Sequence, residues 1–385
     1  MLYTLKMEAG GKVDKRQLLL LELLSPDYLM LEVPSELLPA SATLACDDPA
    51  VFISPSTLEF KSPSAEVSVR LLARPQSSLS LAIRFSFGQS LLVPVYFSQL
   101  PAAKLYSAGA NDNCQLGFQN TSPDIEVESS PMKCTSIPLE VSYQGTFTTL
   151  SAGEKHVLAV TKDGQVVAWG SNESGQLCID EVQSSTSVPR PVAGLERVWQ
   201  VACGQTHSVI LTYENKVYSC GCGQEGRLGH GSEEALRQPM VIKELLGYRL
   251  AKVAAGYSTS FFLDIEGKLL SCGNYSLGAL GHSHSQSLPT LIPDLPPIHQ
   301  VSSGKAHTGC VDFDGTVHLF GDPSDGRLGS PNPRSEVTAA GLGNERARAV
   351  YCGGAHTHIL TESLEVYSFG CNKKGQLGLT RSDFQ

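Results

Sequence analysis

Residues 151–177 read SAGEKHVLAVTKDGQVVAWGSNESGQL, and this stretch decides the fold. It contains a G-x-x-H turn, an apolar run, an Asp-Gly turn, and a second apolar run that ends in Gly170 shortly before Leu177. The Gly-ended run recurs at spacings of about fifty residues, a period typical of solenoids, propellers and arrays. One such unit cannot bury its apolar face alone, so the copies must stack. The other copies end at Gly109, Gly221, Gly273, Gly321 and Gly370.

Each unit is predicted to contain a β-hairpin. Asp163-Gly164 and the corresponding turns of the other copies mostly use residues that accept positive φ and close tight hairpins. After each Leu-Gly pair, a Pro-containing segment such as SVPRPVAGL adds a third and a fourth short strand. Four-stranded sheets repeated about an axis form a β-propeller, so the sequence predicts an all-β fold of this type.

The composition agrees with this fold, and the net charge argues against one class of partner, nucleic acids. The chain has 385 residues with 41% hydrophobic and 17% charged residues, and 36 Gly and 22 Pro suit many short strands and turns. The formal net charge is −9. Nucleic-acid binding relies on Lys and Arg that displace counterions, so no direct nucleic-acid partner is predicted.

The order G-x-x-H-x-x-x-L, D-G-x-V-x-x-W-G and N-x-x-G-Q-L-G resembles the repeat of the regulator of chromosome condensation family. The resemblance covers about residues 101–385 and implies a seven-bladed propeller. Six Gly-ended strands are recognisable but only five G-x-x-H positions, and no seventh blade is visible. We expect each end of the repeat region to supply strands that the other end lacks, because ring closure removes open sheet edges.

Residues 1–100 have none of the repeat landmarks. They contain alternating runs such as VFISPSTLEF and LSLAIRFSF between Pro and Ser turns, which favour an immunoglobulin-like β-sandwich. The alternative, degenerate blades that complete the ring, stays open. The run LLLLELL at 18–24 is interrupted by Glu22 and is too short to cross a bilayer, so we interpret it as a strand and predict no membrane insertion.

The eleven cysteines fall mostly on repeat positions. Cys220 and Cys272 precede the Gly that ends a strand, and Cys203 and Cys352 precede the Gly of the turn motif. We interpret them as small buried hydrophobic residues. Reduced thiols of this kind favour a cytoplasmic location, with the nucleus as the alternative.

No catalytic or metal-binding constellation is apparent. The four turn histidines lie on different copies without acidic or Cys partners at fixed spacing, so we predict a structural role in which a ring nitrogen donates to a backbone carbonyl. The repeated glycines lack the helix that a phosphate loop needs. We predict no catalytic triad, no metal and no cofactor, and nucleotide exchange is the one activity left open.

The resemblance also implies a binding site. Family members that act as guanine nucleotide exchange factors present the G-x-x-H turns to a small GTPase. Carried over by position, the implied partner-binding residues are Glu154, Lys155, His156, Gln205, Thr206, His207, Lys305, His307, Ala355 and His356.

Two functions agree with these residues and with the resemblance. The first is a protein-binding propeller that regulates a small GTPase as a guanine nucleotide exchange factor. The second is a non-catalytic scaffold that links cytoskeletal or signalling partners. The acidic residues of these turns matter in the family's exchange factors, but Glu154 is the one acidic residue of the implied site. This departure counts against exchange on the nuclear GTPase Ran. A chromatin-bound exchange factor would need a basic tail, which this sequence does not supply.

Overall fold

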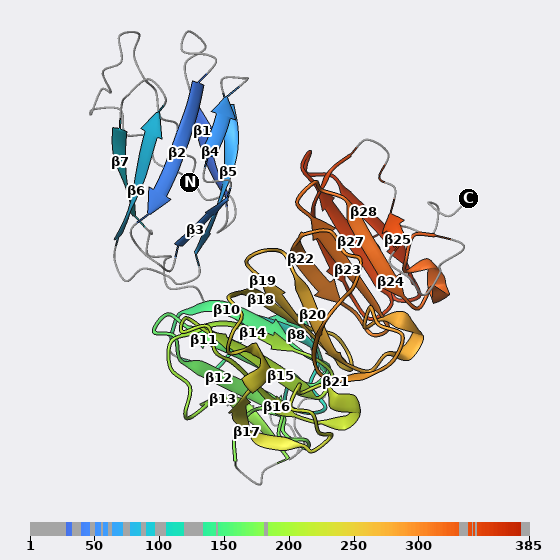
Figure 1. The fold of residues 1–385 in the computed structure, drawn as a ribbon. Coiled ribbons are helices and arrows are strands. Elements are labelled where there is room, and N and C mark those ends of the chain that lie inside the picture. The colour runs from blue at the N-terminus through green and yellow to red at the C-terminus, as the bar shows by residue number, and fades with distance from the viewer. Residues whose placement is uncertain are drawn as a thin grey trace. The chain divides into compact units, whose positions relative to one another are not determined.

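The computed structural model describes residues 105–118, 134–143, 145–180, 184–330, 342 and 345–378, together with the backbone of strands at 338–340 and between 28 and 96. The chain divides into two compact units, Met1–Pro101 and Ala102–Gln385 (Figure 1). Regular structure in the described residues consists of β-strands and short 3-10 turns. The predicted all-β class is confirmed.

The first unit contains two antiparallel sheets with the strand orders β1-β5-β3 and β4-β2-β6-β7. The strands are β1 (Tyr28–Glu32), β2 (Ala40–Cys46), β3 (Val51–Ser54), β4 (Thr57–Phe60), β5 (Ser64–Leu71), β6 (Ser78–Phe85) and β7 (Ser90–Tyr96). The strand expected at 18–24 lies outside the described residues. The immunoglobulin-like packing depends on side chains and connections that also lie outside them, so it stays a prediction.

The second unit is a series of antiparallel sheets in chain order. Its first sheet pairs β8 (Tyr106–Ala110) with β9 (Cys134–Glu140). Four four-stranded sheets follow, made of β10 (Phe147–Ala152), β11 (His156–Thr161), β12 (Val166–Ser171) and β13 (Ser185–Pro191); β14 (Val198–Cys203), β15 (His207–Thr212), β16 (Val217–Gly221) and β17 (Leu236–Val241); β18 (Leu250–Ala255), β19 (Thr259–Asp264), β20 (Leu269–Gly273) and β21 (Gln286–Leu291); and β22 (Ile298–Ser303), β23 (His307–Asp312), β24 (Val317–Gly321) and β25 (Thr338–Ala340). The last described sheet holds β26 (Ala347–Cys352), β27 (His356–Thr361) and β28 (Val366–Gly370).

The predicted hairpins are confirmed in each sheet from β10 onward, where each joins the second and third strands. In the first of them, β11 pairs with β12 from His156 opposite Gly170 to Val160 opposite Val166. Gly164 closes the turn at φ 75°. Positive φ in this turn is what the Asp-Gly and related dipeptides supply.

Apolar side chains pack between consecutive sheets rather than within one. The cluster between the first two four-stranded sheets joins Leu158 and Val166 to Val201 and Ile210. The same kind of cluster recurs at each later junction, and Trp169 anchors the one that faces β8 and β9. Because each sheet buries its apolar faces against its neighbours, the stability of the propeller depends on the packing at each junction between sheets.

The ring closure expected from the sequence depends on segments before 105 and after 378, which lie outside the described residues, so it stays a prediction. The strand β8 pairs with β9 alone, and β28 pairs with β27 alone. Val366 on β28 is 64% exposed, whereas Val317 at the corresponding place on β24 is 0% exposed. The face of β26–β28 that a following sheet would cover is therefore exposed.

This difference predicts unequal effects for one substitution at two matched sites. Val317→Asp places a carboxylate in an apolar junction and should lower the free energy of unfolding by about 3–5 kcal/mol. Val366→Asp should change it by less than about 0.5 kcal/mol, because the side chain already contacts water. Urea denaturation measures the free energy of unfolding of both variants. Equal losses at the two sites would contradict the exposure of the outer face of β26–β28.

Candidate partner-binding face

Consecutive G-x-x-H turns are joined by backbone hydrogen bonds. The Gln205 amide donates to the Tyr257 carbonyl at 3.2 Å, Tyr257 to Gly304 at 3.0 Å, and Lys305 to Gly354 at 3.2 Å. The turns that begin at Gly204, Gly256, Gly304 and Gly353 are therefore joined in series, and the turn at Gly153 packs closely on that at Gly204, where a Cβ on Gly153 would lie 2.3 Å from the Gly204 carbonyl oxygen. Together the turns form a continuous rim at one end of the sheets. We call this rim the turn face.

Glycine begins each turn because the rim leaves no room for a side chain. A Cβ on Gly204 would lie 2.6 Å from the Gly256 carbonyl oxygen, and one on Gly304 would lie 2.1 Å from that of Gly353. Such contacts are far inside van der Waals distance, so a side chain here would push the turns apart. Glycine, which has no Cβ, allows the neighbouring backbone to approach this closely.

A buried histidine at the end of three turns bonds to a hydroxyl group on the next sheet. The Nε2–oxygen distances are 3.0, 3.0 and 2.9 Å for the pairs His156–Ser208, His207–Ser260 and His307–Thr357. Each hydroxyl donates in turn to a backbone carbonyl at 2.7–2.8 Å, and the acceptors are Gln176, Arg227 and Arg327. We call this series the histidine link. The prediction of a direct bond to a carbonyl was wrong, since the hydroxyl lies between the two groups.

The hydroxyl determines the tautomer of the histidine. Ser208 donates its single proton to Gln176, so His156 must donate from Nε2 and keep a lone pair on Nδ1. The Nδ1 atoms of His156, His207 and His307 are buried without a hydrogen-bond partner among the described residues. Protonation would leave a charge there unpaired, and burial accordingly lowers the pKa of His156 and His307 to about 4 and that of His207 to about 3.

The junction without a histidine uses hydroxyl groups instead. Thr259 Oγ1 lies 3.4 Å from Ser303 Oγ, which bonds to Thr308 Oγ1 at 2.8 Å. Thr308 then donates to the Ala279 carbonyl at 2.8 Å. A second hydroxyl thus spans the distance that the longer imidazole spans at the other junctions.

The structure divides the ten predicted binding residues into two groups. His156, His207 and His307 are 0% exposed, so their side chains offer no surface to a partner. We assign these three histidines a structural role, in which they hold the turns in place from the inside. The sequence had implied that they contact the partner directly. The residues with surface to offer are Glu154, Lys155 and Lys305, which are exposed, and Gln205, Thr206, Ala355 and His356, which are half-buried.

Tyr257, which sequence reasoning missed, stands between two of these residues. Its hydroxyl bonds to the Gln205 side chain, and Lys305 Nζ lies 5.1 Å from the centre of its ring. The G-x-x-H pattern does not match this turn because Thr259 replaces the histidine. Alignment of the copies by their glycines would have revealed an aromatic residue where Gln205 and Lys305 stand.

The loops after the Gly-ended strands adjoin the same face. The Ser171 amide donates to the Lys155 carbonyl at 2.8 Å, and Asp322 donates to Ala306 at 2.7 Å. In the second loop Arg327 pairs with Asp322 at 3.2 Å and with Asp325 at 3.1 Å. These ion pairs lie within the loop and leave less free acidic charge on the face, while the backbone bond from Asp322 to Ala306 joins the loop to the turn.

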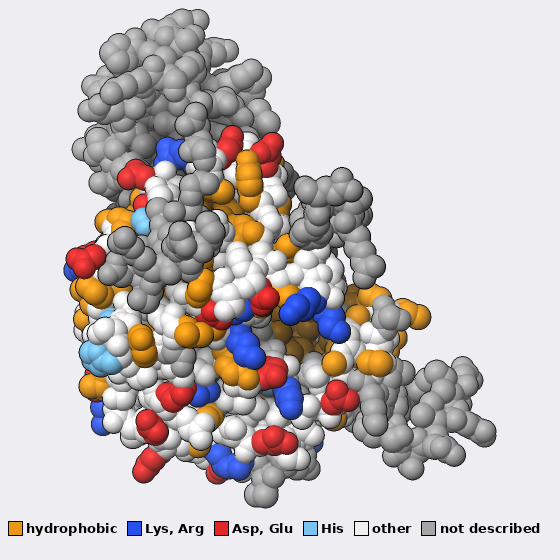
Figure 2. All heavy atoms as spheres, turned by 90° about the vertical axis from the view of Figure 1, so that its right-hand side faces the viewer, with side chains coloured by type: hydrophobic (Ala, Val, Ile, Leu, Met, Phe, Trp, Pro, Cys, Tyr) orange, Lys and Arg blue, Asp and Glu red, His pale blue; other side chains and the backbone are white. Residues whose placement is uncertain are grey.

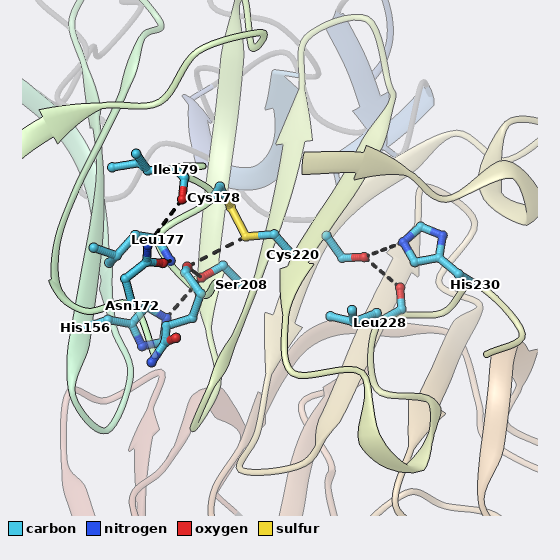
Figure 3. The surroundings of a disulfide bond; sticks show 11 residues. His156, Asn172, Leu177, Cys178, Ile179, Ser208, Cys220, Leu228 and His230 are labelled. Atoms are coloured by element: carbon cyan, nitrogen blue, oxygen red, sulfur yellow. Dashed lines mark hydrogen bonds between the residues drawn. A yellow bond between two sulfur atoms is a disulfide. The ribbon is translucent and has the colours of Figure 1, made fainter. Parts of the chain in front are cut away.

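One cysteine prediction was wrong. Cys220 is buried as expected, but it forms a disulfide with Cys178 of the preceding sheet (Figure 3). Cys203 and Cys272 are buried and free, in agreement with the prediction for them, whereas Cys352 is free but only half-buried. The spacing along the chain gave no sign of the bond because its cysteines belong to different repeats.

The described residues hold no group of three His, Cys, Asp or Glu side chains that could bind a metal ion. None of the helices in the described part of the chain has the length and hydropathy needed to span a membrane.

The repeated sheets and their stacked turns are matched by a family model, the RCC1-like domain, over residues 100–385. The chain belongs to this family. The RCC1-like region is also similar in fold to yeast RCC1 (Prp20), with a TM-score of 0.60 at 19% identity over 79% of this chain and 71% of that one. Human WBSCR16 gives a TM-score of 0.63 at 22% identity over 70% and 75% of the two chains.

Several characterised proteins share RCC1-like sequence with this chain. Identity is 30% to the E3 ubiquitin-protein ligase HERC2 of Mus musculus over 293 residues, which are 73% of this chain and 6% of that protein. It is 28% to the ultraviolet-B receptor UVR8 of Arabidopsis thaliana, over 72% and 63% of the two proteins. It is 30% to the secretion-regulating guanine nucleotide exchange factor of Bos taurus, over 57% and 51%. The chain spans less than two thirds of each of these relatives.

The histidine link predicts a specific pH dependence of stability. Unfolded histidines bind protons near pH 6.5, whereas His156, His207 and His307 bind them only near pH 3–4 when folded. Unfolding therefore takes up protons between these values, and the free energy of unfolding should fall as the pH drops from about 6.5 to about 4. His207→Thr should remove about one proton from this uptake, or about 1.4 kcal/mol per pH unit of slope.

Ser208→Ala is the matched control for this measurement. It removes the hydroxyl that His156 contacts but keeps the titrating ring, so stability should fall while the proton uptake persists. Urea denaturation from pH 4 to pH 7 gives both quantities. An unchanged slope in His207→Thr would show that the buried ring does not resist protonation.

Proposed function

We propose that this RCC1-like propeller binds and regulates a small GTPase through its turn face, with guanine nucleotide exchange as the activity. The observation that carries the proposal is the rim of closely packed turns, in which backbone hydrogen bonds hold Lys305 and the buried His156 anchors the turn that carries Glu154 and Lys155. Rigid presentation of a few exposed side chains is how scaffolds carry binding sites. We place the protein in the cytoplasm, with the nucleus as the alternative.

Two relatives support this choice. The bovine relative at 30% identity is named a secretion-regulating guanine nucleotide exchange factor. Prp20p of Saccharomyces cerevisiae is similar in fold, at 22% identity with a TM-score of 0.57. Its solved structure is described together with its binding properties to Gsp1p and histones. The first supports exchange activity, and the second supports a protein partner for the shared fold.

The charge of the surface fits a protein partner better than a nucleic acid. The net charge of the chain is −9. Figure 2 shows Lys and Arg side chains interspersed with Asp and Glu on the face in view, without one large area of a single sign. Mixed charges of this kind select a complementary protein surface and do not attract a polyphosphate.

An exchange assay tests the proposal. A panel of small GTPases loaded with fluorescent nucleotide is mixed with the full chain, and acceleration on at least one member is expected. Lys305→Ala and Tyr257→Ala should each reduce the rate on that GTPase by about 5–30-fold, as central interface residues do. Absence of acceleration on every member would overturn the exchange activity.

Lys268→Ala is the control, because Lys268 is exposed in the β19–β20 turn at the opposite end of the strands from the turn face. It should leave the exchange rate unchanged. Complexes whose affinity ignores the nucleotide state would favour the scaffold function instead. An equal loss of rate in Lys268→Ala and Lys305→Ala would exclude the turn face as the binding site.

A further inference from the structure

The disulfide between Cys178 and Cys220 occupies a contact that recurs at later junctions of the propeller. The residue after the repeated Leu of one copy faces the residue before the strand-ending Gly of the next. A Cβ on Gly229 would lie 3.3 Å from Cys272 Sγ, and one on Gly281 would lie 3.2 Å from the Phe320 ring. At the junction between the first two four-stranded sheets the same two positions hold Cys178 and Cys220, and their sulfur atoms are bonded.

Cys178 departs from the repeat in its backbone as well. Its φ is 59°, and its counterparts in the described repeats, with φ between 65° and 80°, are Gly117, Gly229, Gly281, Gly329 and Gly378. Glycine adopts this left-handed conformation freely, whereas a residue with a Cβ is disfavoured there. The chain therefore keeps a disfavoured residue at the one position from which it can bond to Cys220.

The disulfide lies directly beside the histidine link of the same junction. Cys220 is paired with Ser208 across β15 and β16, and Ser208 is the hydroxyl group that His156 contacts. Ser208 donates to the carbonyl of Gln176, two residues before Cys178, and Cys220 Sγ lies 3.7 Å from that same oxygen. Figure 3 shows the disulfide beside Ser208, with His156 on the other side of that hydroxyl group.

We propose that this disulfide is a redox-sensitive lock on its junction, and that its reduction loosens the turns at Gly153–His156 and Gly204–His207. The covalent bond fixes the Gln176 carbonyl relative to Ser208, and the histidine link transmits that position to the turn at Gly153–His156. Once the bond is broken, Cys178 keeps its disfavoured conformation without the partner that held it. The junction then opens more often than its neighbours.

A protein dithiol of the thioredoxin class is the reductant we assign. One of its thiolates attacks a sulfur of the pair, the S–S bond breaks, and a mixed disulfide forms. The second thiolate of the reductant then displaces the cysteine. Cys178 and Cys220 end as protonated thiols after a two-electron reduction, and the reductant leaves as a disulfide. Because the two cysteines are 3% and 0% exposed, attack requires prior opening of the junction.

The test uses the full chain with and without dithiothreitol. Alkylation and mass spectrometry count the free thiols, a thermal scan gives the Tm of the propeller, and hydrogen exchange reports on the two turns. Reduction should free Cys178 and Cys220, lower the Tm by about 5–10 °C, and speed exchange at the two turns. Full reduction without a change in turn exchange would overturn the lock, even if the Tm falls.

Matched variants separate the lock from general effects of the reductant. Cys178→Gly installs the residue of the other junctions and should abolish the response to dithiothreitol, and Cys220→Ala should do the same. Cys272→Ala changes the free cysteine at the corresponding place of the next junction, so it should keep the full response. A Cys178→Gly protein that still responds would place the redox-sensitive group elsewhere. None of these readouts depends on binding of a GTPase.

Discussion

The fold depends on a polar bond placed inside an apolar junction. Apolar packing is not directional, so it would let two neighbouring sheets slide over one another. The histidine link prevents this, because a histidine, a hydroxyl and a backbone carbonyl must meet at hydrogen-bond distances in one arrangement. A buried polar group left without a partner is costly, which makes the correct alignment much more stable than any shifted one.

The link also explains how one scaffold can carry different binding surfaces. The histidines and hydroxyls are buried, while the two residues between the Gly and the histidine of each turn point outward or lie half-buried. Glu154, Gln205, Tyr257 and Lys305 all occupy the same position in successive turns and differ in charge and size. Substitution there leaves the link intact, so the turn face can change its partner without loss of the fold.

The sequence predicted those features that lie within one repeat. Hairpins, turn types and the Gly positions depend on residues that are close along the chain, and the structure confirms them. The hydroxyl partner, the role of Tyr257 and the disulfide each join two repeats, so no single copy reveals them. A signal for the first did exist: Ser208, Ser260, Thr308 and Thr357 all directly follow the turn motif, and comparison of the copies in parallel would have shown it.

The last described sheet has the histidine of the link but not the hydroxyl group that the histidine contacts at the other junctions. Here His356 lies 4.9 Å from the ring of His358, centre to centre, on the exposed face of β27. Tyr351 stands on this face where earlier sheets have Ala202 or Ser302, and it is 54% exposed. Because each junction needs a hydroxyl from the following sheet, this face has the histidine without the partner that orients it, and local opening should be easiest here.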